Sequence, residues 1–375
     1  MSALESFDSI LKRHIAEKDM AGASYAVVIN GETAYKNCVG HANLEKDIPL
    51  SSDTIMRLAS MTKPITGVAV MKACELGLLR LDDPVEKYIP EFAELTVADI
   101  EDGKVVGSHP AKNRLFVLDL LNHTSGLGMG TVPQDVLAGI TAGDTLETKI
   151  PLYAKQPLDF EPRTAAGYSA TMAFDVACRI VEIVSGMEYE AFIRRYILDP
   201  LGMKDTGYEL TEEMESRLAV MYHCTDGKIV PSRPEQIILP NVPGTYRCGG
   251  TQMFSTLDDY TKFALMLAND GELNGVRILS KESVDAIATS TLPESIRCGS
   301  WEEWGISVRV IQHKSEPSQM LNKGAFGWSG AYETHFFIDR ELKMCAVLFK
   351  NVTSGLGAGA VTSREFETEV MKLFN

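Results

Sequence analysis

The spacing of apolar positions predicts a helix at the start of the chain. Residues 3–18 alternate apolar and charged positions at helical spacing. The apolar side chains on one face are Leu4, Phe7, Ile10, Leu11 and Ile15. The chain therefore opens with an amphipathic helix that needs a surface to cover.

Strand patterns follow this helix and return near the other end of the chain. Residues 23–29 and 32–40 flank the turn dipeptide Asn30-Gly31, which is typical of a tight hairpin. The β-branched and aromatic enrichment of residues 304–312, 332–339 and 344–350 predicts further strands, and residues 362–374 predict a closing amphipathic helix. We expect both ends to build one antiparallel sheet.

The middle of the chain has a mostly helical pattern. Gly and Pro interrupt it in the segments 101–114 and 225–245, which we interpret as long loops. We therefore expect an α+β fold, in which an antiparallel β-sheet flanked by the N- and C-terminal helices carries an inserted, mostly helical lobe. Residues 1–65 and 245–375 would form the first lobe and residues 66–244 the second, with the active site between them.

Charge and cysteine content narrow the function classes. The 375 residues carry a formal net charge of −15, which repels phosphate backbones and anionic lipids, so we expect no nucleic-acid or membrane partner. No run of 18 apolar residues and no secretory signal pattern occurs. The seven scattered cysteines include no C-x-x-C pair. We expect a cytoplasmic protein with reduced thiols.

Ser60 and Lys63 form the first candidate for chemistry. On a helix this i, i+3 spacing places a hydroxyl and an amine on one face, one turn apart. Pro64 requires the helix to begin near Ser60, and the residues up to Gly77 leave almost no polar face. The helix is thus predicted to be buried, with free N–H groups at Ser60. This segment alone would equally fit an N-cap serine beside a surface lysine.

The same S-x-x-K spacing recurs at Ser9 and Lys12. These residues lie on the amphipathic opening helix, where charged side chains simply face water. We therefore assign no chemistry to them.

Two further segments accompany Ser60 and Lys63. Residues 160–171, FEPRTAAGYSAT, form a Pro/Gly-rich loop that carries Tyr168, and residues 324–339, GAFGWSGAYETHFFID, form a glycine-rich approach to a strand. Taken with LLNHTSGL at 120–127, ILDPLGMKDTGY at 197–208 and residues 248–267, they make the sequence resemble the penicillin-recognising serine hydrolases. It is most similar to the family VIII carboxylesterases and the class C β-lactamases, over nearly the whole chain.

The resemblance implies the β-lactamase/transpeptidase-like fold and a set of site residues. Ser60 matches the nucleophile, Lys63 its partner on the same helix, and Tyr168 the tyrosine of the second motif. Trp328-Ser329-Gly330 stands where the β-lactamases have Lys-Thr-Gly and would bind substrate. The implied oxyanion hole uses the backbone N–H groups of Ser60 and Ala331.

Two departures from the β-lactamase pattern favour esters. Tyr168-Ser169-Ala170 lacks the asparagine that the β-lactamases offer to an amide, and Trp328 replaces the lysine that helps to hold a carboxylate. Because tryptophan supplies apolar surface, the pocket suits a neutral ester better than an anionic lactam. We therefore expect a hydrolase of small esters that forms an acyl-Ser60 intermediate.

Several alternatives stay open at this stage. A β-lactamase, a D-amino-acid peptidase or an acyltransferase could use the same Ser-Lys-Tyr core, and a catalytically silent homologue could bind a small acyl ligand instead. Either a neutral Lys63 or a Tyr168 phenolate could take the proton of Ser60, since the pair would titrate as one unit.

The remaining polar candidates predict no additional chemistry. His123 lies in a Thr/Ser/Gly turn and His335 within a predicted strand, so we expect structural hydrogen bonds from both. No H-E-x-x-H motif and no Cys/His cluster occurs, so we expect neither a metal nor another cofactor.

Overall fold

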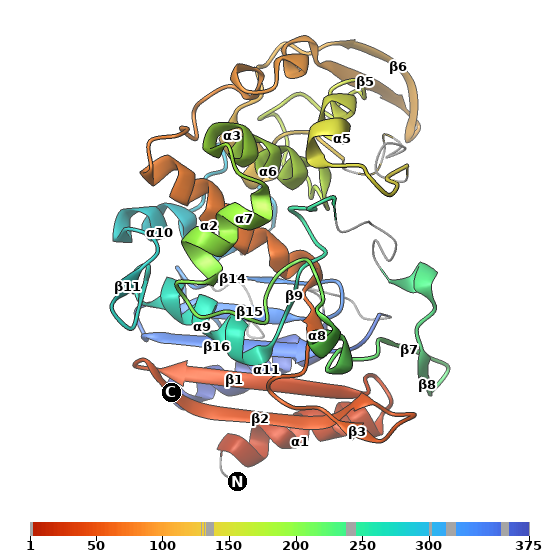
Figure 1. Cartoon of the computed structure of the whole chain (residues 1–375), viewed down its shortest axis with the longest axis vertical. Coiled ribbons are helices and arrows are strands. Elements are labelled where there is room, and N and C mark those ends of the chain that lie inside the picture. The colour runs from red at the N-terminus through yellow and green to blue at the C-terminus, as the bar shows by residue number, and fades with distance from the viewer. Residues whose placement is uncertain are drawn as a thin grey trace.

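The structure is a computed structural model that describes residues 3–128, 130, 132, 139–237, 245–299, 302–312, 320–353 and 360–374. An eight-stranded antiparallel sheet forms its lower half in Figure 1, with the strand order β12-β13-β14-β15-β16-β1-β2-β3. The strands are β1 (Gly22–Ile29), β2 (Glu32–Asn43), β3 (Ile48–Pro49), β12 (Glu302–Trp304), β13 (Arg309–Ile311), β14 (Phe326–Ser329), β15 (His335–Asp339) and β16 (Met344–Lys350). Ala23 of β1 lies opposite Lys350 of β16, so the two ends of the chain meet at the centre of the sheet.

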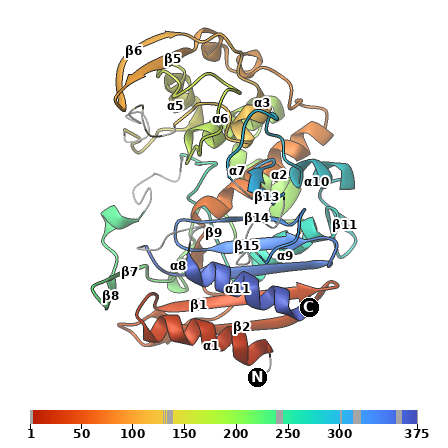
Figure 2. The ribbon, with the colours of Figure 1, turned by 180° about the vertical axis from the view of Figure 1, so that it is seen from behind.

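Helices cover both faces of this sheet (Figures 1 and 2). Helices α1 (Ala3–Ala16) and α11 (Val361–Met371) pack side by side on one face, where Phe7 and Phe366 contact the ring of Tyr25. Helix α9 (Leu257–Ala268) packs on the other face against β15, β16 and β1. The predicted amphipathic helices at 3–18 and 362–374 are confirmed, with ends that differ by at most three residues.

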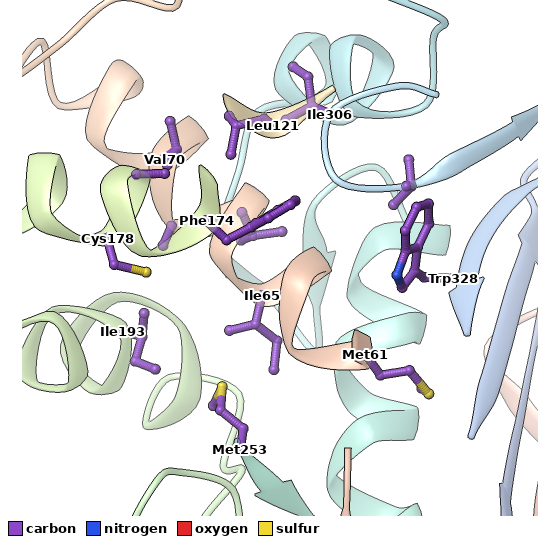
Figure 3. Packing of buried hydrophobic residues seen from close by; sticks show 14 of the residues in the cluster. Met61, Ile65, Val70, Leu121, Phe174, Cys178, Ile193, Met253, Ile306 and Trp328 are labelled. Atoms are coloured by element: carbon purple, nitrogen blue, oxygen red, sulfur yellow. The ribbon is translucent and has the colours of Figure 1, made fainter. Parts of the chain in front are cut away.

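The central helix α2 (Thr62–Glu75) joins the sheet to the upper, helix-rich part of the molecule. Every residue from Thr62 to Met71 is buried, as the nearly complete apolar pattern predicts. Figure 3 shows Ile65 and Val70 of α2 beside Phe174 of α6, while Trp328 approaches from the sheet. The other helices are α3 (Val117–Leu121), α5 (Leu146–Tyr153), α6 (Met172–Ser185), α7 (Tyr189–Ile193), α8 (Glu212–Ser216) and α10 (Lys281–Ile287).

Two segments interpreted as loops are instead hairpins in part. β5 (Thr96–Glu101) pairs with β6 (Lys104–Pro110), and β7 (Tyr222–Thr225) pairs with β8 (Lys228–Pro231). Both turns are Asp-Gly dipeptides with positive φ, at residues 102–103 and 226–227. The prediction of loops was wrong because these strands are largely exposed and therefore lack an alternating apolar pattern.

The predicted strand at 304–312 is also divided in two. Trp304 ends β12 and pairs with Arg309 at the start of β13 across a tight turn. Ser307 in this turn has φ = 62°, a left-handed conformation that no continuous strand allows. The predicted strand at 332–339 begins only at His335, since residues 330–334 form the preceding turn.

The expected α+β class is confirmed by the antiparallel sheet with its terminal helices and the inserted helical region. The lobe boundaries near residues 65 and 245 stay a prediction. Among the described residues, no helix combines the length and the apolar character that a membrane span requires.

A buried ionic cluster fastens α11 to the sheet. Glu367 on α11 forms an ion pair with Arg309 of β13, and its Oε1 lies 2.9 Å from His335 Nε2 of β15. Burial alone would raise the pKa of Glu367, but Arg309 and His335 hold this pKa at about 2. The carboxylate is therefore ionised in the folded protein, and it stabilises the folded state.

We predict that Glu367 makes the free energy of unfolding depend on pH below about 4.5. Because its folded pKa of about 2 lies below the ordinary value of 4.5, its contribution is present above pH 4.5 and is lost as the pH falls toward 2. Glu367→Gln should lower the free energy of unfolding at pH 7 by about 3 kcal/mol, the cost of breaking a buried ion pair.

Urea unfolding between pH 2 and 7 would measure this effect. The difference in the free energy of unfolding between wild type and Glu367→Gln should decrease as the pH falls below 4.5. Glu341→Gln, at an exposed position in the turn between β15 and β16, is the control. A difference that stays constant down to pH 2 would contradict the prediction.

Candidate active site

Ser60 lies in a 3-10 turn, Ala59–Met61, that leads directly into α2. Ala59 has φ = 46°, a strained value for a residue with a side chain. Neighbouring segments hold the turn in place, since Leu58 N donates to Met253 O and the Tyr260 hydroxyl donates to Met61 O. The turn therefore presents Ser60 at the amino end of a buried helix, where the helix dipole favours negative charge.

Lys63 is fully buried one turn further along the chain. Its Nζ donates to Ala170 O at 2.6 Å and to Gly250 O at 2.8 Å, and it lies 3.3 Å from Ser60 Oγ. Nζ also lies 4.9 Å from the centre of the Tyr168 ring. Two carbonyl oxygens and an aromatic face stabilise positive charge on this amine.

Tyr168 approaches Ser60 from a loop more than 100 residues away. Its Oη lies 2.6 Å from Ser60 Oγ, within hydrogen-bond distance. The structure thus brings together the hydroxyl, the amine and the phenol that the sequence predicted as a site.

His123 supports the loop that carries Tyr168. Its Nδ1 accepts a hydrogen bond from the N–H of Ser169, and its carbonyl accepts one from Gly167. Its ring lies 5.0 Å from that of Tyr168 and stacks on Trp328 at 5.7 Å. Burial, and secondarily the charge of Lys63, hold the pKa of His123 well below its usual value. The ring is therefore neutral at neutral pH, and its contacts agree with the expected structural role.

A pocket of about 360 Å³ opens beside Ser60. Its lining includes all the site residues predicted from the sequence except the fully buried Lys63. These are Ser60, Tyr168, Trp328, Ser329, Gly330 and Ala331. Thr251, Glu302, Trp304 and Arg309 also line it. Sequence reasoning assigned none of these four to the site: Thr251 lies in the 248–267 segment but was given no role, and the other three stand in no recognised motif.

The end of β14 is held against the Ser60 turn. Gly330 N donates to Thr334 O at 2.7 Å, and the Thr334 hydroxyl donates to Leu58 O at 3.0 Å. A Cβ on Gly330 would collide with Thr334 Oγ1 and would lie 2.5 Å from Leu58 O. Glycine is therefore required for the strand to approach the turn this closely, and both Ser60 and Ala331 border the same pocket.

Comparison with known proteins agrees with this arrangement. The family model described as Beta-lactamase matches residues 7–365. Esterase EstB of Burkholderia gladioli is 29% identical over 383 residues, which cover 95% of this chain and 92% of that protein. Protein Rv1367c of Mycobacterium tuberculosis (strain ATCC 25618 / H37Rv) is 30% identical over 319 residues, which cover 81% and 79%.

Solved structures share the fold. EstCE1, described as a hydrolase with promiscuous acyltransferase activity, superimposes with a TM-score of 0.83 at 22% identity and covers 98% of both chains. A family VIII carboxylesterase superimposes with a TM-score of 0.76 at 21% identity and covers 99% of this chain and 98% of its own.

We predict that Gly330→Ala damages both stability and activity. The added methyl group must push β14 away from the Ser60 turn, which should cost about 1–3 kcal/mol of folding free energy. The shift should also lower the rate of covalent labelling of Ser60 by an active-site serine probe. Thermal unfolding and labelling kinetics would measure the two effects.

Gly107→Ala is the matched control. Gly107 lies in the exposed strand β6, where the nearest atom to an added Cβ is a carboxylate oxygen of Asp99. If Gly330→Ala matches this control in its rate of Ser60 labelling and in its thermal stability, the prediction is wrong. The close approach of β14 to the Ser60 turn would then be unnecessary for stability and for labelling.

Proposed function

The chain belongs to the beta-lactamase family, and we propose that it is a serine hydrolase that cleaves small carboxylic esters through an acyl-Ser60 intermediate. The observation that carries the proposal is the 2.6 Å contact between Ser60 Oγ and Tyr168 Oη beside the buried Lys63. The similarity to an esterase over nearly the whole chain supports the same reaction class.

The proposed first step is attack of Ser60 Oγ on the ester carbonyl carbon. The proposed acceptor of its proton is the phenolate form of Tyr168, whose Oη lies beside Ser60 Oγ and whose ring lies beside Lys63. Of the two bases that the sequence left open, we propose Tyr168, because two carbonyl oxygens already stabilise a cationic Lys63. Collapse of the tetrahedral intermediate returns this proton to the departing alkoxide.

Hydrolysis of the acyl-enzyme repeats these transfers with water. Tyr168 takes a proton from a water molecule that attacks the acyl carbon, and it then returns the proton to Ser60 Oγ. We propose that the backbone N–H groups of Ser60 and Ala331 stabilise the oxyanion in both steps, which their positions in the pocket lining support.

The pocket favours an ester over a lactam. Trp328 contributes an apolar wall where the β-lactamases have a lysine. The carbonyl of Ala170, which stands in place of the motif asparagine, is occupied by Lys63, and Ser169 is fully buried with its hydroxyl accepting from Ala173 N. Neither residue therefore replaces the side-chain amide that the motif asparagine would offer to a lactam.

The proposed setting is the cytoplasm. All seven cysteines are free thiols, as suits a reducing compartment. The net charge of −15 supports a small-molecule substrate rather than a nucleic acid.

We predict that Ser60→Ala abolishes ester hydrolysis. Removal of the nucleophile should lower kcat for p-nitrophenyl butyrate by at least about a thousandfold. Wild type should also gain the mass of a fluorophosphonate probe at Ser60, whereas the variant should not.

Parallel assays separate the alternatives. Nitrocefin and a D-alanyl amide, assayed beside the ester, rank lactamase and peptidase activity against esterase activity. Equal ester hydrolysis by wild type and Ser60→Ala would refute the assignment. Absence of both turnover and labelling in wild type would favour a silent ligand-binding homologue.

We predict that Tyr168→Phe keeps the fold and loses the proton transfer. Phenylalanine preserves the ring contact with His123 but removes Oη, so kcat should fall about a hundredfold or more with little change in thermal stability. Tyr35→Phe, in β2 and outside the pocket lining, is the control. A Tyr168→Phe enzyme within tenfold of wild type would exclude Tyr168 as the base.

A further inference from the structure

The pocket is lined by two apolar tryptophan side chains, Trp304 and Trp328, and also by polar residues of the sheet. Ser329 ends β14 and lies directly across from His335 of β15 in the antiparallel register. Ser329 Oγ and His335 Nδ1 are 2.8 Å apart, and both residues are buried. Ser329, Arg309 and Glu302 line the pocket, and contacts through His335 and Glu367 link the three residues, which together define its polar end.

The direction of the Ser329–His335 hydrogen bond follows from what lies behind the histidine. His335 Nε2 faces the Glu367 carboxylate at 2.9 Å. Burial lowers the pKa of His335, so its ring is neutral at neutral pH, while the pKa of Glu367 is held at about 2. A lone pair on Nε2 would be repelled by the carboxylate at 2.9 Å, so we place the single ring proton on Nε2, although its direction does not make a regular hydrogen bond to Glu367, and Nδ1 is then an acceptor.

This tautomer determines what Ser329 offers to a ligand. Because Nδ1 can only accept, the hydroxyl proton of Ser329 is donated to His335. The oxygen then has only lone pairs left for the pocket. Ser329 can accept a hydrogen bond from a substrate but cannot donate one.

The charges near Ser329 also disfavour a substrate that carries a carboxylate. Arg309 faces two carboxylates, since it pairs with Glu367 and its Nη1 lies 3.5 Å from Glu302 Oε2. Glu302 Oε2 finds no hydrogen-bond partner among the described residues. Two carboxylates against one guanidinium leave an excess of negative charge, which repels a substrate carboxylate.

We propose that the Ser329–Glu302 end of the pocket binds an ester whose polar group is a hydrogen-bond donor, a hydroxyl or an amine, and excludes an ester that carries a carboxylate. This selectivity deepens the proposed esterase function and rests on it. It assigns Ser329 the role of an acceptor, and it makes Glu302 and His335 determinants of specificity.

Two matched substrate series test the proposal. The first consists of p-nitrophenyl esters of hexanoic acid, 6-hydroxyhexanoic acid and hexanedioic acid, so that only the end of the acyl chain differs. The second consists of hexyl, 6-hydroxyhexyl and 5-carboxypentyl acetate, which place the same groups on the alcohol. In the series that reaches the polar end, kcat/KM for the hydroxyl ester should exceed that for the carboxylate ester at least about tenfold.

Three variants locate the effect. Ser329→Ala should lower the ratio of hydroxyl-ester to methyl-ended-ester kcat/KM about fivefold, the effect of one neutral hydrogen bond. Glu302→Gln should reduce the discrimination against the carboxylate ester at least about threefold. Glu303→Gln is the matched control, because Glu303 pairs with Arg297 and does not line the pocket, and it should leave the ratios unchanged.

The outcomes separate this proposal from the one on which it rests. If the wild type neither hydrolyses any ester nor labels at Ser60, both proposals fail. If Ser60-dependent hydrolysis occurs but the carboxylate ester reacts as well as the hydroxyl ester in both series, only the selectivity proposal is overturned. It is equally overturned if Ser329→Ala and Glu302→Gln leave the ratios unchanged.

Discussion

The site depends on the hydrogen bonds of the buried Lys63 amine. Ala170 O and Gly250 O, from two segments more than 100 residues downstream, both accept its hydrogen bonds. A buried amine without hydrogen bonds would cost free energy, so the fold must keep these carbonyls in place. The lysine thereby determines where the Tyr168 loop and the 246–251 segment meet the catalytic helix.

The buried carboxylate of Asp175 supports this arrangement. Asp175 of α6 accepts hydrogen bonds from Gly249 N at 2.8 Å and from the Tyr246 hydroxyl at 2.7 Å. Burial raises the pKa of Asp175 to about 6, although these hydrogen bonds favour its charged form. Since Gly249 precedes the glycine whose carbonyl binds Lys63, α6 positions that carbonyl through Asp175. The strained φ of Ala59 persists because such contacts over-determine the surrounding segments.

The pocket combines two chemical characters because it lies where the sheet meets the helices. Trp328 packs with the apolar core toward α2, while Ser329, the next residue of the same strand, hydrogen-bonds His335 below the sheet. Alternation of side chains along β14 therefore supplies an apolar wall and a polar contact from adjacent positions. The ionic cluster that fastens α11 to the sheet also sets the tautomer of His335, so fold stability and substrate selectivity share the same residues.

Local patterns were enough to identify the terminal helices, the first hairpin, the buried helix after Ser60 and the motifs that mark the family. These features depend on periodicity and turn chemistry, which act over a few residues. They failed at the exposed hairpins near residues 102 and 226 and at the strand divided by Ser307, where solvent or a single left-handed residue overrides the pattern. Only tertiary structure decided that Tyr168 Oη lies 2.6 Å from Ser60 Oγ, which carbonyls accept hydrogen bonds from Lys63, and that Ser329 Oγ lies 2.8 Å from His335 Nδ1. Each of these depends on groups far apart in the chain, whose distance and orientation no local sequence pattern encodes.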